Sequence, residues 1–149
     1  MDVQKAYCSP AVGQHVVCTF LLPREILVDH RPLIDMAEKV LREFRYGIFG
    51  VMVGYFNEER VRDGKTGYTA VLTLSESHMS FHTYPEHETR IAGNSYGTVA
   101  FDFYTCRSDD NDAAWEVFTP LRESLEKRFG AKVLRGTLMS FPRLVKPNS

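Results

Sequence analysis

The sequence predicts an α+β fold, a two-layer α/β sandwich in which two helices cover a mainly antiparallel sheet. Strand-like segments come in adjacent runs and do not alternate one by one with helices, which disfavours βαβ units. Two other segments carry the apolar stripe of a helix packed on a sheet. The chain has 149 residues, of which 44% are hydrophobic and 25% charged. These values suit a globular domain with a sizeable core. With no linker-like stretch in between, we expect one domain over residues 1–149.

The first predicted elements are a strand, a helix and a second strand. Gln14–Leu22 is apolar and rich in β-branched residues, as buried strands are. Asp29 suits a helix N-cap, and Ile48–Phe56 has the composition of the next strand. Between them, apolar residues recur at i, i+3, i+4, i+7, i+8 and i+11, which predicts a helix with one buried face. These residues are Leu33, Met36, Ala37, Val40, Leu41 and Phe44.

The middle of the chain predicts two further strands. Asn57–Gly67 is a charged connection, and Tyr68–Leu74 returns as a strand. Ser77–His82 continues in extended form, so successive side chains face opposite sides of the sheet. Met79 and Phe81 then face one way, and His78, Ser80 and His82 face the other.

The last third predicts a loop, a strand, a helix and a final strand. Glu86–Tyr96 is polar and turn-rich, and Gly97–Thr105 reads as a strand. Asp112 could cap a helix that Gly130 closes. Pro120 lies inside that helix, which predicts a kink or a restart with Thr119 as the new cap. Lys132–Ser140 supplies the last strand, followed by a loose tail from Pro142 to Ser149.

Composition excludes several classes of partner. The net charge of −1 and the pI near 6.5 give no electrostatic case for nucleic acid or an anionic membrane surface. No apolar stretch approaches the roughly 20 residues of a membrane span, and the N-terminus lacks a signal-peptide core. Three cysteines without metal-type spacing suggest reduced thiols, so we expect a cytoplasmic protein.

Histidines near position 80 raise the possibility of a zinc site. His78 and His82 are four apart, with Glu86 and His87 nearby. That spacing matches a helix face, whereas the intervening apolar residues and Pro85 favour strand and turn. Structural zinc also usually draws on paired cysteines. We therefore expect no metal.

One segment carries a recognisable motif. Glu76-Ser77-His78 is followed by His82-Thr83-Tyr84-Pro85-Glu86, and Cys106 ends the run Phe103-Tyr104-Thr105-Cys106. Together these resemble the processing segment of prokaryotic S-adenosylmethionine decarboxylase proenzymes, and the order of elements fits that family from Gly13 to Ser140. The resemblance implies that the chain cuts itself between Glu76 and Ser77. The products would be a β chain of residues 1–76 and an α chain of residues 77–149.

The resemblance also implies roles for individual residues. Ser77 becomes a pyruvoyl group, the only cofactor, which captures the substrate amine as a Schiff base. His82 is the proton acceptor in processing, and Thr69 matches a family serine whose hydroxyl steadies the oxyanion of the acyl shift. Cys106 matches the cysteine that donates a proton during decarboxylation, and a thiol is an adequate acid for this.

Two positions are implied in substrate binding. Tyr84 stands where the family usually has Trp, a ring that helps to hold adenine, and Glu86 matches the residue that contacts the ribose. The chain is longer than usual near His87–Ser95, beside the expected pocket. Phe56 is a candidate for a second adenine-stacking ring.

Ser77 and His82 are five residues apart, so a regular strand places them on opposite faces. Either a turn at Thr83-Tyr84-Pro85 reorients His82, or the break at Ser77 frees its end to move. Both arrangements are open at this point.

The resemblance implies a place in polyamine biosynthesis and a symmetric homodimer of cleaved pairs with a small-molecule substrate. S-adenosylmethionine is the expected substrate. An arginine or ornithine decarboxylase on the same machinery is the alternative, because pyruvoyl chemistry is indifferent to the side chain. A third reading is an unprocessed pseudoenzyme that regulates a functional decarboxylase.

Overall fold

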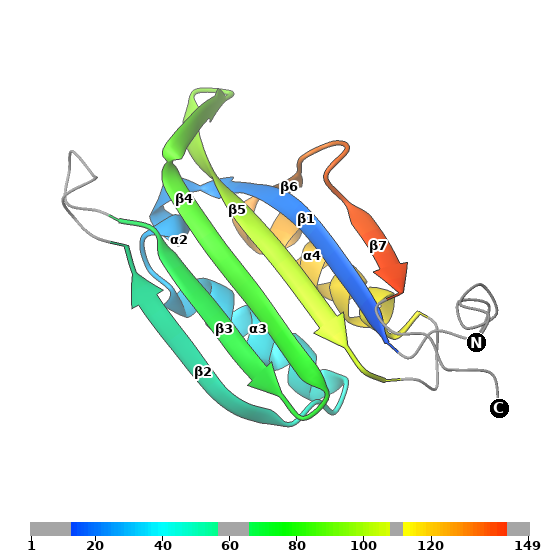
Figure 1. Cartoon of the computed structure of the whole chain (residues 1–149). Coiled ribbons are helices and arrows are strands. Elements are labelled where there is room, and N and C mark those ends of the chain that lie inside the picture. The colour runs from blue at the N-terminus through cyan, green and yellow to red at the C-terminus, as the bar shows by residue number, and fades with distance from the viewer. Residues whose placement is uncertain (1–12, 57–65, 108–111, 143–149) are drawn as a thin grey trace, which may run out of the picture.

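The computed structural model describes residues 13–56, 66–107 and 112–142. Its first layer is a seven-stranded sheet in the order β2-β3-β4-β5-β1-β6, with β7 pairing with β1 as well (Figure 1). Every strand pair is antiparallel, as the sequence predicts. The strands are β1 (Gln14–Pro23), β2 (Ile48–Tyr55), β3 (Tyr68–Leu74), β4 (Ser77–Ile91), β5 (Asn94–Thr105), β6 (Lys132–Val133) and β7 (Met139–Pro142).

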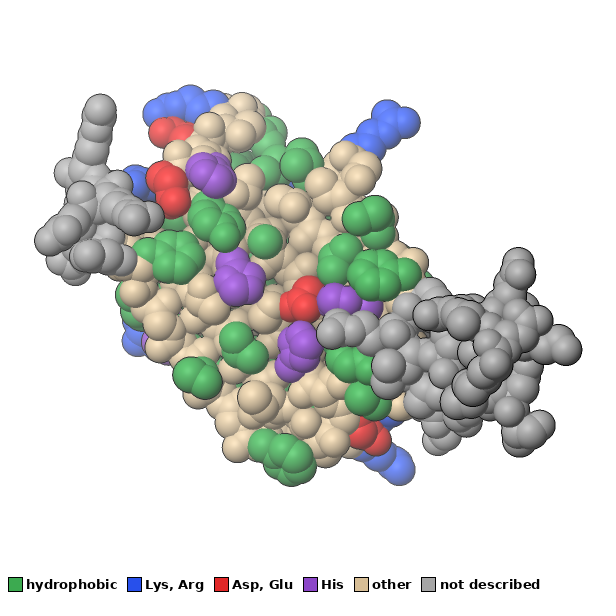
Figure 2. Space-filling model, viewed as in Figure 1, with side chains coloured by type: hydrophobic (Ala, Val, Ile, Leu, Met, Phe, Trp, Pro, Cys, Tyr) green, Lys and Arg blue, Asp and Glu red, His purple; other side chains and the backbone are tan. Residues whose placement is uncertain are grey.

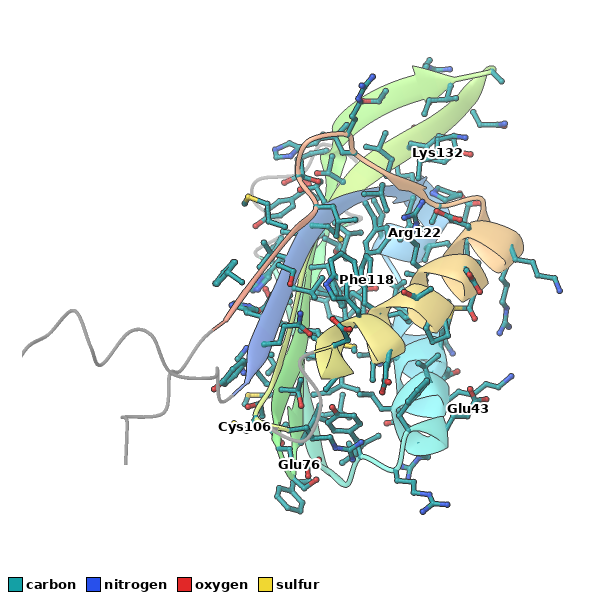
Figure 3. All side chains as sticks on the ribbon, turned by 90° about the vertical axis from the view of Figure 1, so that its right-hand side faces the viewer. Glu43, Glu76, Cys106, Phe118, Arg122 and Lys132 are labelled. Atoms are coloured by element: carbon teal, nitrogen blue, oxygen red, sulfur yellow. The ribbon has the colours of Figure 1, made fainter. Side chains whose placement is uncertain are left out.

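The second layer consists of helices on one face of the sheet. The long helices α3 (Arg31–Glu43) and α4 (Ala113–Phe129) both lie behind the sheet in Figure 1 and to one side of it in Figure 3. A short helix, α2 (Arg24–Leu27), was not predicted from the sequence. None of the described helices is long and apolar enough to cross a membrane. The two-layer α+β architecture is therefore confirmed, and the opposite face of the sheet has no helix among the described residues.

The core fills the space between the sheet and the two helices. Met79 and Phe81 on β4 are fully buried, and Phe118 of α4 packs against Phe20 and Phe101 of the sheet. The predicted alternation along β4 is thus confirmed, with His78, Ser80 and His82 on the uncovered face. We call this helix-free side of β1, β3, β4 and β5 the open face.

Helix α3 begins slightly later than predicted. The N-cap position is His30, and its side chain makes no capping hydrogen bond. Asp29 lies one residue earlier, and its Oδ1 accepts a hydrogen bond from the backbone N–H of Arg31 at 3.1 Å. Asp29 still satisfies a donor of the first turn, although the predicted cap is displaced by one residue.

Helix α4 runs unbroken through Pro120. The predicted cap position, Asp112, is confirmed, but its side chain makes no capping hydrogen bond. The predicted restart at Thr119 is wrong, because one helix spans Ala113–Phe129. Val117, Phe118 and Leu121 flank the proline and are buried, so packing against the sheet maintains the helix despite one missing N–H donor.

The long β4–β5 hairpin is the largest departure from the sequence prediction. The expected turn at Thr83–Pro85 and the irregular segment Glu86–Tyr96 are wrong. β4 continues to Ile91, and β5 already starts at Asn94. Ala92 and Gly93 form the two-residue turn, with φ of 48° and 84°, the backbone of a type I′ hairpin. Pairing between β4 and β5 therefore keeps this polar segment in strand form, although its composition favours a loop.

The predicted last strand is also divided. β6 and β7 each pair with β1, and the backbone turns between them near Gly136, whose φ is 84°. The N–H of Thr137 donates to the carbonyl of Leu134 at 3.2 Å and closes this turn. The charged connection from Asn57 and the tail after Pro142 lie largely or wholly outside the described residues.

Candidate active site

Ser77 lies at the end of a tight hairpin. Leu74 pairs with Ser77 across β3 and β4, which leaves Ser75 and Glu76 as a two-residue turn. Ser77 has a φ of 132°, a backbone region that L-residues rarely adopt. A residue held in such a conformation stores strain of about 1–3 kcal/mol. The sheet thus forces the serine after Glu76 into an unfavourable geometry.

The end of β5 lies directly beside this turn. Ser77 pairs with Thr105, and the backbone N–H of the next residue, Cys106, donates to the carbonyl oxygen of Glu76 at 2.9 Å. The Oγ of Ser77 is 3.0 Å from the Sγ of Cys106. Glu76 and Cys106 lie together at the same end of the sheet in Figure 3. Two residues of the motif that are 29 apart in the sequence therefore share a hydrogen bond.

This arrangement can promote attack on the Glu76 carbonyl. The Cys106 N–H is aimed at the oxygen on which negative charge would develop, as in an oxyanion hole. Ser77, the candidate nucleophile, is intermediate in burial, and Cys106 is exposed. A substrate can therefore reach the thiol from solvent.

His82 and Thr69 form a separate pair. They face each other across β3 and β4, with 3.0 Å between Thr69 Oγ1 and His82 Nδ1. The resemblance to the decarboxylases implies that both residues act in processing, and the structure brings them into contact.

The structure does not bring His82 to Ser77. The register of β4 against β5 is continuous from Ser77 to Tyr84. Five residues of regular strand span about 17 Å, at roughly 3.3 Å per residue. No turn at Thr83 reorients His82, so within one chain its imidazole lies far from the serine hydroxyl.

Tyr84 belongs to a cluster of rings further along β4. The ring of Tyr84 stacks on that of His87, with centroids 5.1 Å apart and planes 11° apart. Phe56 is a further ring beside Tyr84, 5.8 Å away between centroids and tilted by 36°. Phe56 is a stacking candidate from the sequence, whereas the sequence does not predict His87 as a ring partner. Glu86 is exposed beside this cluster.

An acidic residue organises the centre of the open face. Asp102 Oδ2 is 2.8 Å from His15 Nε2 and 3.1 Å from His78 Nε2, and Ser80 Oγ donates to Oδ1. Burial alone would raise the pKa of Asp102, but these three hydrogen bonds outweigh it and hold the pKa below its ordinary value. Sequence reasoning missed this cluster, although the alternation of His78 and Ser80 placed both residues on the correct face.

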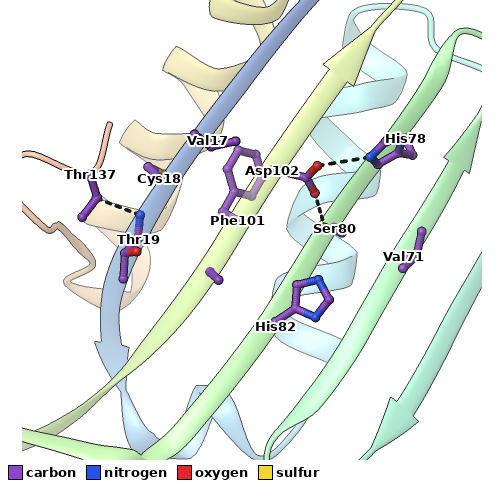
Figure 4. A pocket seen from close by; sticks show the side chains of 11 residues that line it. Val17, Cys18, Thr19, Val71, His78, Ser80, His82, Phe101, Asp102 and Thr137 are labelled. Carbon is purple, nitrogen blue, oxygen red and sulfur yellow. Dashed lines mark hydrogen bonds and ion pairs between the residues drawn. The ribbon is translucent and has the colours of Figure 1, made fainter. Parts of the chain in front are cut away.

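The cluster lines a shallow hollow of about 710 Å³ (Figure 4). His78 and Ser80 point toward Asp102, and His82 lies further along the same strand. Figure 2 shows this face, with several histidines gathered around an acidic side chain. Within residues 13–56, 66–107 and 112–142, no group of three or more His, Cys, Asp or Glu side chains is arranged to hold a metal ion.

The remaining described cysteine is not a candidate nucleophile. Cys18 is buried in the core, and its burial raises the pKa of the thiol to about 12. It therefore stays protonated at neutral pH and acts as a small hydrophobic residue. Cys8 lies outside the described residues.

Residues 14–135 match the sequence profile of a family described as S-adenosylmethionine decarboxylase. The chain belongs to the S-adenosylmethionine decarboxylase family. This match includes Ser77, His82 and Cys106 and confirms the resemblance drawn from the motif.

Individual members of the S-adenosylmethionine decarboxylase family agree with this assignment. The chain is 30% identical over 119 residues to the S-adenosylmethionine decarboxylase proenzyme of Thermosipho africanus, covering 79% of this chain and 78% of the relative. It is 27% identical over 119 residues to the proenzyme of the same name from Thermotoga maritima, with the same coverage. The crystal structure of the adenosylmethionine decarboxylase from Aquifex aeolicus has the same fold, with a TM-score of 0.58 at 20% identity, covering 88% of this chain and 95% of that one.

Proposed function

We propose that the chain is a proenzyme that cuts itself between Glu76 and Ser77 and then decarboxylates S-adenosylmethionine. One observation supports the cleavage most directly. The β3–β4 turn brings together the strained Ser77, the Cys106 N–H that donates to the Glu76 carbonyl, and the Cys106 thiol. Membership of the family supports the reaction.

The cleavage can be written from the residues present. Ser77 Oγ attacks the Glu76 carbonyl carbon, the C–N bond breaks, and the amine of Ser77 takes the hydroxyl proton, which leaves an ester. A base then removes the Cα proton of Ser77. The ester C–O bond breaks, leaving Glu76 with a terminal carboxylate and a dehydroalanine at position 77. Tautomerisation and hydrolysis with one water yield ammonia and the pyruvoyl end. The Cys106 N–H stabilises the oxyanion of the first step.

The residues around position 77 fit a pyruvoyl group. Such a group supplies an electron-accepting carbonyl for amine substrates when it is present. Ser77 is partly accessible, and Cys106 Sγ is within hydrogen-bond distance of its side chain. Cys106 would deliver the proton that replaces the lost carboxylate on the substrate.

The ring cluster favours an adenine-containing substrate over a simple amino acid. Tyr84, His87 and Phe56 offer planar faces, and adenine stacks on such faces. Glu86 is exposed beside them and can accept hydrogen bonds from ribose hydroxyls. Neither feature is needed to bind arginine or ornithine.

The separation of His82 from Ser77 points to a second copy of the chain. In a two-fold symmetric dimer with paired open faces, the two contacts between protomers are equivalent. An arrangement that places Ser77 of one protomer near His82 of its partner therefore also places the partner's Ser77 near His82 of the first protomer. We propose that the protein is a homodimer in which His82, Thr69 and the ring cluster at Tyr84 of one chain serve the Ser77 site of the other.

Mass spectrometry of the purified protein tests the cleavage. We expect fragments of residues 1–76 and 77–149, the second one blocked by a pyruvoyl group. Ser77→Ala should remain a single chain. An intact wild-type chain of 17.0 kDa would instead support the pseudoenzyme reading.

Co-expression of two inactive chains tests the shared site. Chains with Ser77→Ala keep His82, and chains with His82→Ala keep Ser77. Each variant alone should stay uncut, and the His82→Ala chain should be cut when both are present. No cleavage in the mixed dimer would place the base elsewhere.

Release of carbon dioxide identifies the substrate. S-adenosylmethionine, arginine and ornithine should be compared at equal concentration with cleaved protein. We expect release from S-adenosylmethionine, and release from arginine or ornithine alone would establish the alternative.

A further inference from the structure

We propose that Arg107 is a positioning residue for self-cleavage, acting by holding the Glu76 side chain. This inference rests on the proposed function, because it concerns the same scissile bond. Arg107 follows Cys106 directly and was not singled out by the sequence. Its side chain is nevertheless the most extensively bonded one at the cleavage site.

The guanidinium of Arg107 connects three segments of the chain. Nε donates to Glu76 Oε2 at 2.6 Å, a short charge-assisted hydrogen bond. One terminal nitrogen donates to the carbonyl of Phe44 at 2.7 Å, and the other donates to the carbonyl of Arg45 at 3.0 Å. These carbonyls follow the C-terminus of α3, where a cation is favourable.

Neighbouring groups fix the orientation of this guanidinium. It lies 3.7 Å above the centre of the Tyr46 ring. The hydroxyl of Tyr46 is 2.7 Å from Thr105 Oγ1, and Thr105 Oγ1 in turn accepts the backbone N–H of Arg107 at 3.2 Å. Thr105 is fully buried and Tyr46 nearly so. These contacts therefore fix the plane of the Arg107 guanidinium, with its Nε–H directed at Glu76.

Glu76 is consequently held at two points by adjacent residues. Its carbonyl accepts the N–H of Cys106, and its carboxylate accepts the side chain of Arg107. Ser75, the other residue of this exposed to half-exposed turn, is bonded to Gly47 instead: its N–H donates to the Gly47 carbonyl at 2.8 Å, and its Oγ accepts the Gly47 N–H at 3.2 Å. The ion pair keeps the turn against β5, so that the carbonyl stays on its oxyanion donor while Ser77 attacks. A misplaced carbonyl lowers the rate of such a reaction.

A purely structural role is the competing explanation. Arg107 could simply satisfy the carbonyls of Phe44 and Arg45 after α3, with Glu76 as a bystander. The two roles can be separated because Glu76→Gln leaves both carbonyl contacts intact and removes only the ion pair. The side chains of Arg107 and Glu76 are 28% and 40% exposed, so solvent partly screens the ion pair. Its contribution is therefore measured through the rate of self-cleavage.

The test is a double-mutant cycle on the rate of self-cleavage. Wild type, Arg107→Gln, Glu76→Gln and the double variant are made as uncut chains by cell-free synthesis, and fragment formation is followed over time by gel electrophoresis. Arg107→Lys is a conservative variant that retains the charge. Arg122→Gln is the matched control, because Arg122 forms a similar pair with Glu126, 2.7 Å long, on helix α4. Thermal unfolding of each variant is measured in the Ser77→Ala background.

We expect each single glutamine variant to cleave about 10-fold more slowly, the effect of losing one charged hydrogen bond. The double variant should be no slower than the slower single one, Arg107→Lys should recover part of the rate, and Arg122→Gln should cleave normally. The inference would be overturned if Arg107→Gln slowed cleavage by the same factor in the wild-type chain and in the Glu76→Gln chain. Unchanged cleavage rates in all variants would also overturn it. Wild-type protein that never cleaves would overturn the proposed function as well.

Discussion

At the scale of single residues, Asp102 is the group whose environment differs most from what its position in a strand suggests. An acidic residue in the middle of β5 would ordinarily face water. Here His15, His78 and Ser80 surround its carboxylate on the open face. The ionised form is the one that these contacts stabilise.

Asp102 should therefore link stability to pH. Its pKa is lowered on folding, so its contribution is present above the unfolded value near 3.9 and is lost as pH falls through the folded value. We expect Asp102→Asn to lower the free energy of unfolding at pH 7 by about 1–3 kcal/mol. Urea titrations between pH 2 and 7 in the Ser77→Ala background would show this.

The difference in stability between Asp102→Asn and the Ser77→Ala parent should shrink below about pH 4. There the unfolded parent chain binds a proton at Asp102, while the folded parent keeps the carboxylate ionised until its lowered pKa is reached. A difference that stays constant across this range would mean that the charge of Asp102 is not what stabilises the cluster.

Cys106 should separate processing from catalysis. Its backbone N–H, which bonds the Glu76 carbonyl, is retained in Cys106→Ala, and only the thiol is lost. We expect cleavage largely intact and turnover slowed about 100-fold or more, the usual size of a general-acid contribution. Fragment analysis and carbon dioxide release give the two readings, and unchanged turnover would make the proton-donor assignment wrong.

At the scale of elements, the β4–β5 hairpin shows how close approach of backbones shapes the site. The register shifts between Tyr84 and Thr89, so residues 85–88 bulge out opposite Gly97. A Cβ at position 97 would lie 2.7 Å from the Tyr84 carbonyl oxygen and 2.5 Å from Leu27 Cδ1. The glycine therefore permits the bulge that presents Glu86 and His87.

Gly97→Ala should consequently destabilise the protein by about 1–3 kcal/mol, the cost of overpacking. The control is Gly54→Ala on β2, where a Cβ would meet nothing within 4 Å. Thermal unfolding of both variants in the Ser77→Ala background measures the effect. Equal stability of the two variants would show that the bulge adjusts without strain.

Pro120 offers a test in the opposite direction. It interrupts no packing, but it cannot donate to the carbonyl of Glu116, four residues earlier. Pro120→Ala should raise the free energy of unfolding by about 1–3 kcal/mol, less than the full propensity difference because proline also restricts the unfolded chain. Urea denaturation checks this, and a loss of stability would indicate that the ring itself packs productively.

Several elements follow from sequence, and others do not, for reasons that lie in specific residues. The stripe from Leu33 to Val40 and the alternation from His78 to Phe81 encode burial directly, and both are confirmed. The turn at Ala92–Gly93 carries no such signal, because alanine is rare at positive φ. The contacts of Asp102 and Arg107 depend on residues tens of positions away, which no local pattern reports.

At the scale of the whole molecule, the two faces of the sheet differ sharply. Helices α3 and α4 cover one face, and the other presents apolar strand residues around the Asp102 cluster. Large hydrophobic side chains are also exposed at the edges of the sheet, including Met52 and Met139. A monomer with such a surface is prone to associate.

A charge placed on the open face should weaken the proposed dimer. Val71 lies on β3 opposite Ser80 and lines the same hollow as His82, and Val71→Asp would bury an unpaired carboxylate between two copies. We expect at least about 10-fold weaker association and slower cleavage, measured by sedimentation and gel electrophoresis. Lys39→Asp, on the exposed side of α3, should change neither quantity.

The positive φ of Ser77 has a consequence for when the reactive end can arise. A newly made or denatured chain relaxes that torsion and carries Cys106 far from Glu76, so its Glu76–Ser77 bond behaves like any other peptide bond. In the proposed self-cleavage, only a molecule whose β3, β4 and β5 are already paired has the geometry needed to break this bond. Maturation would therefore act as a checkpoint on folding, and misfolded copies would never acquire an electrophile.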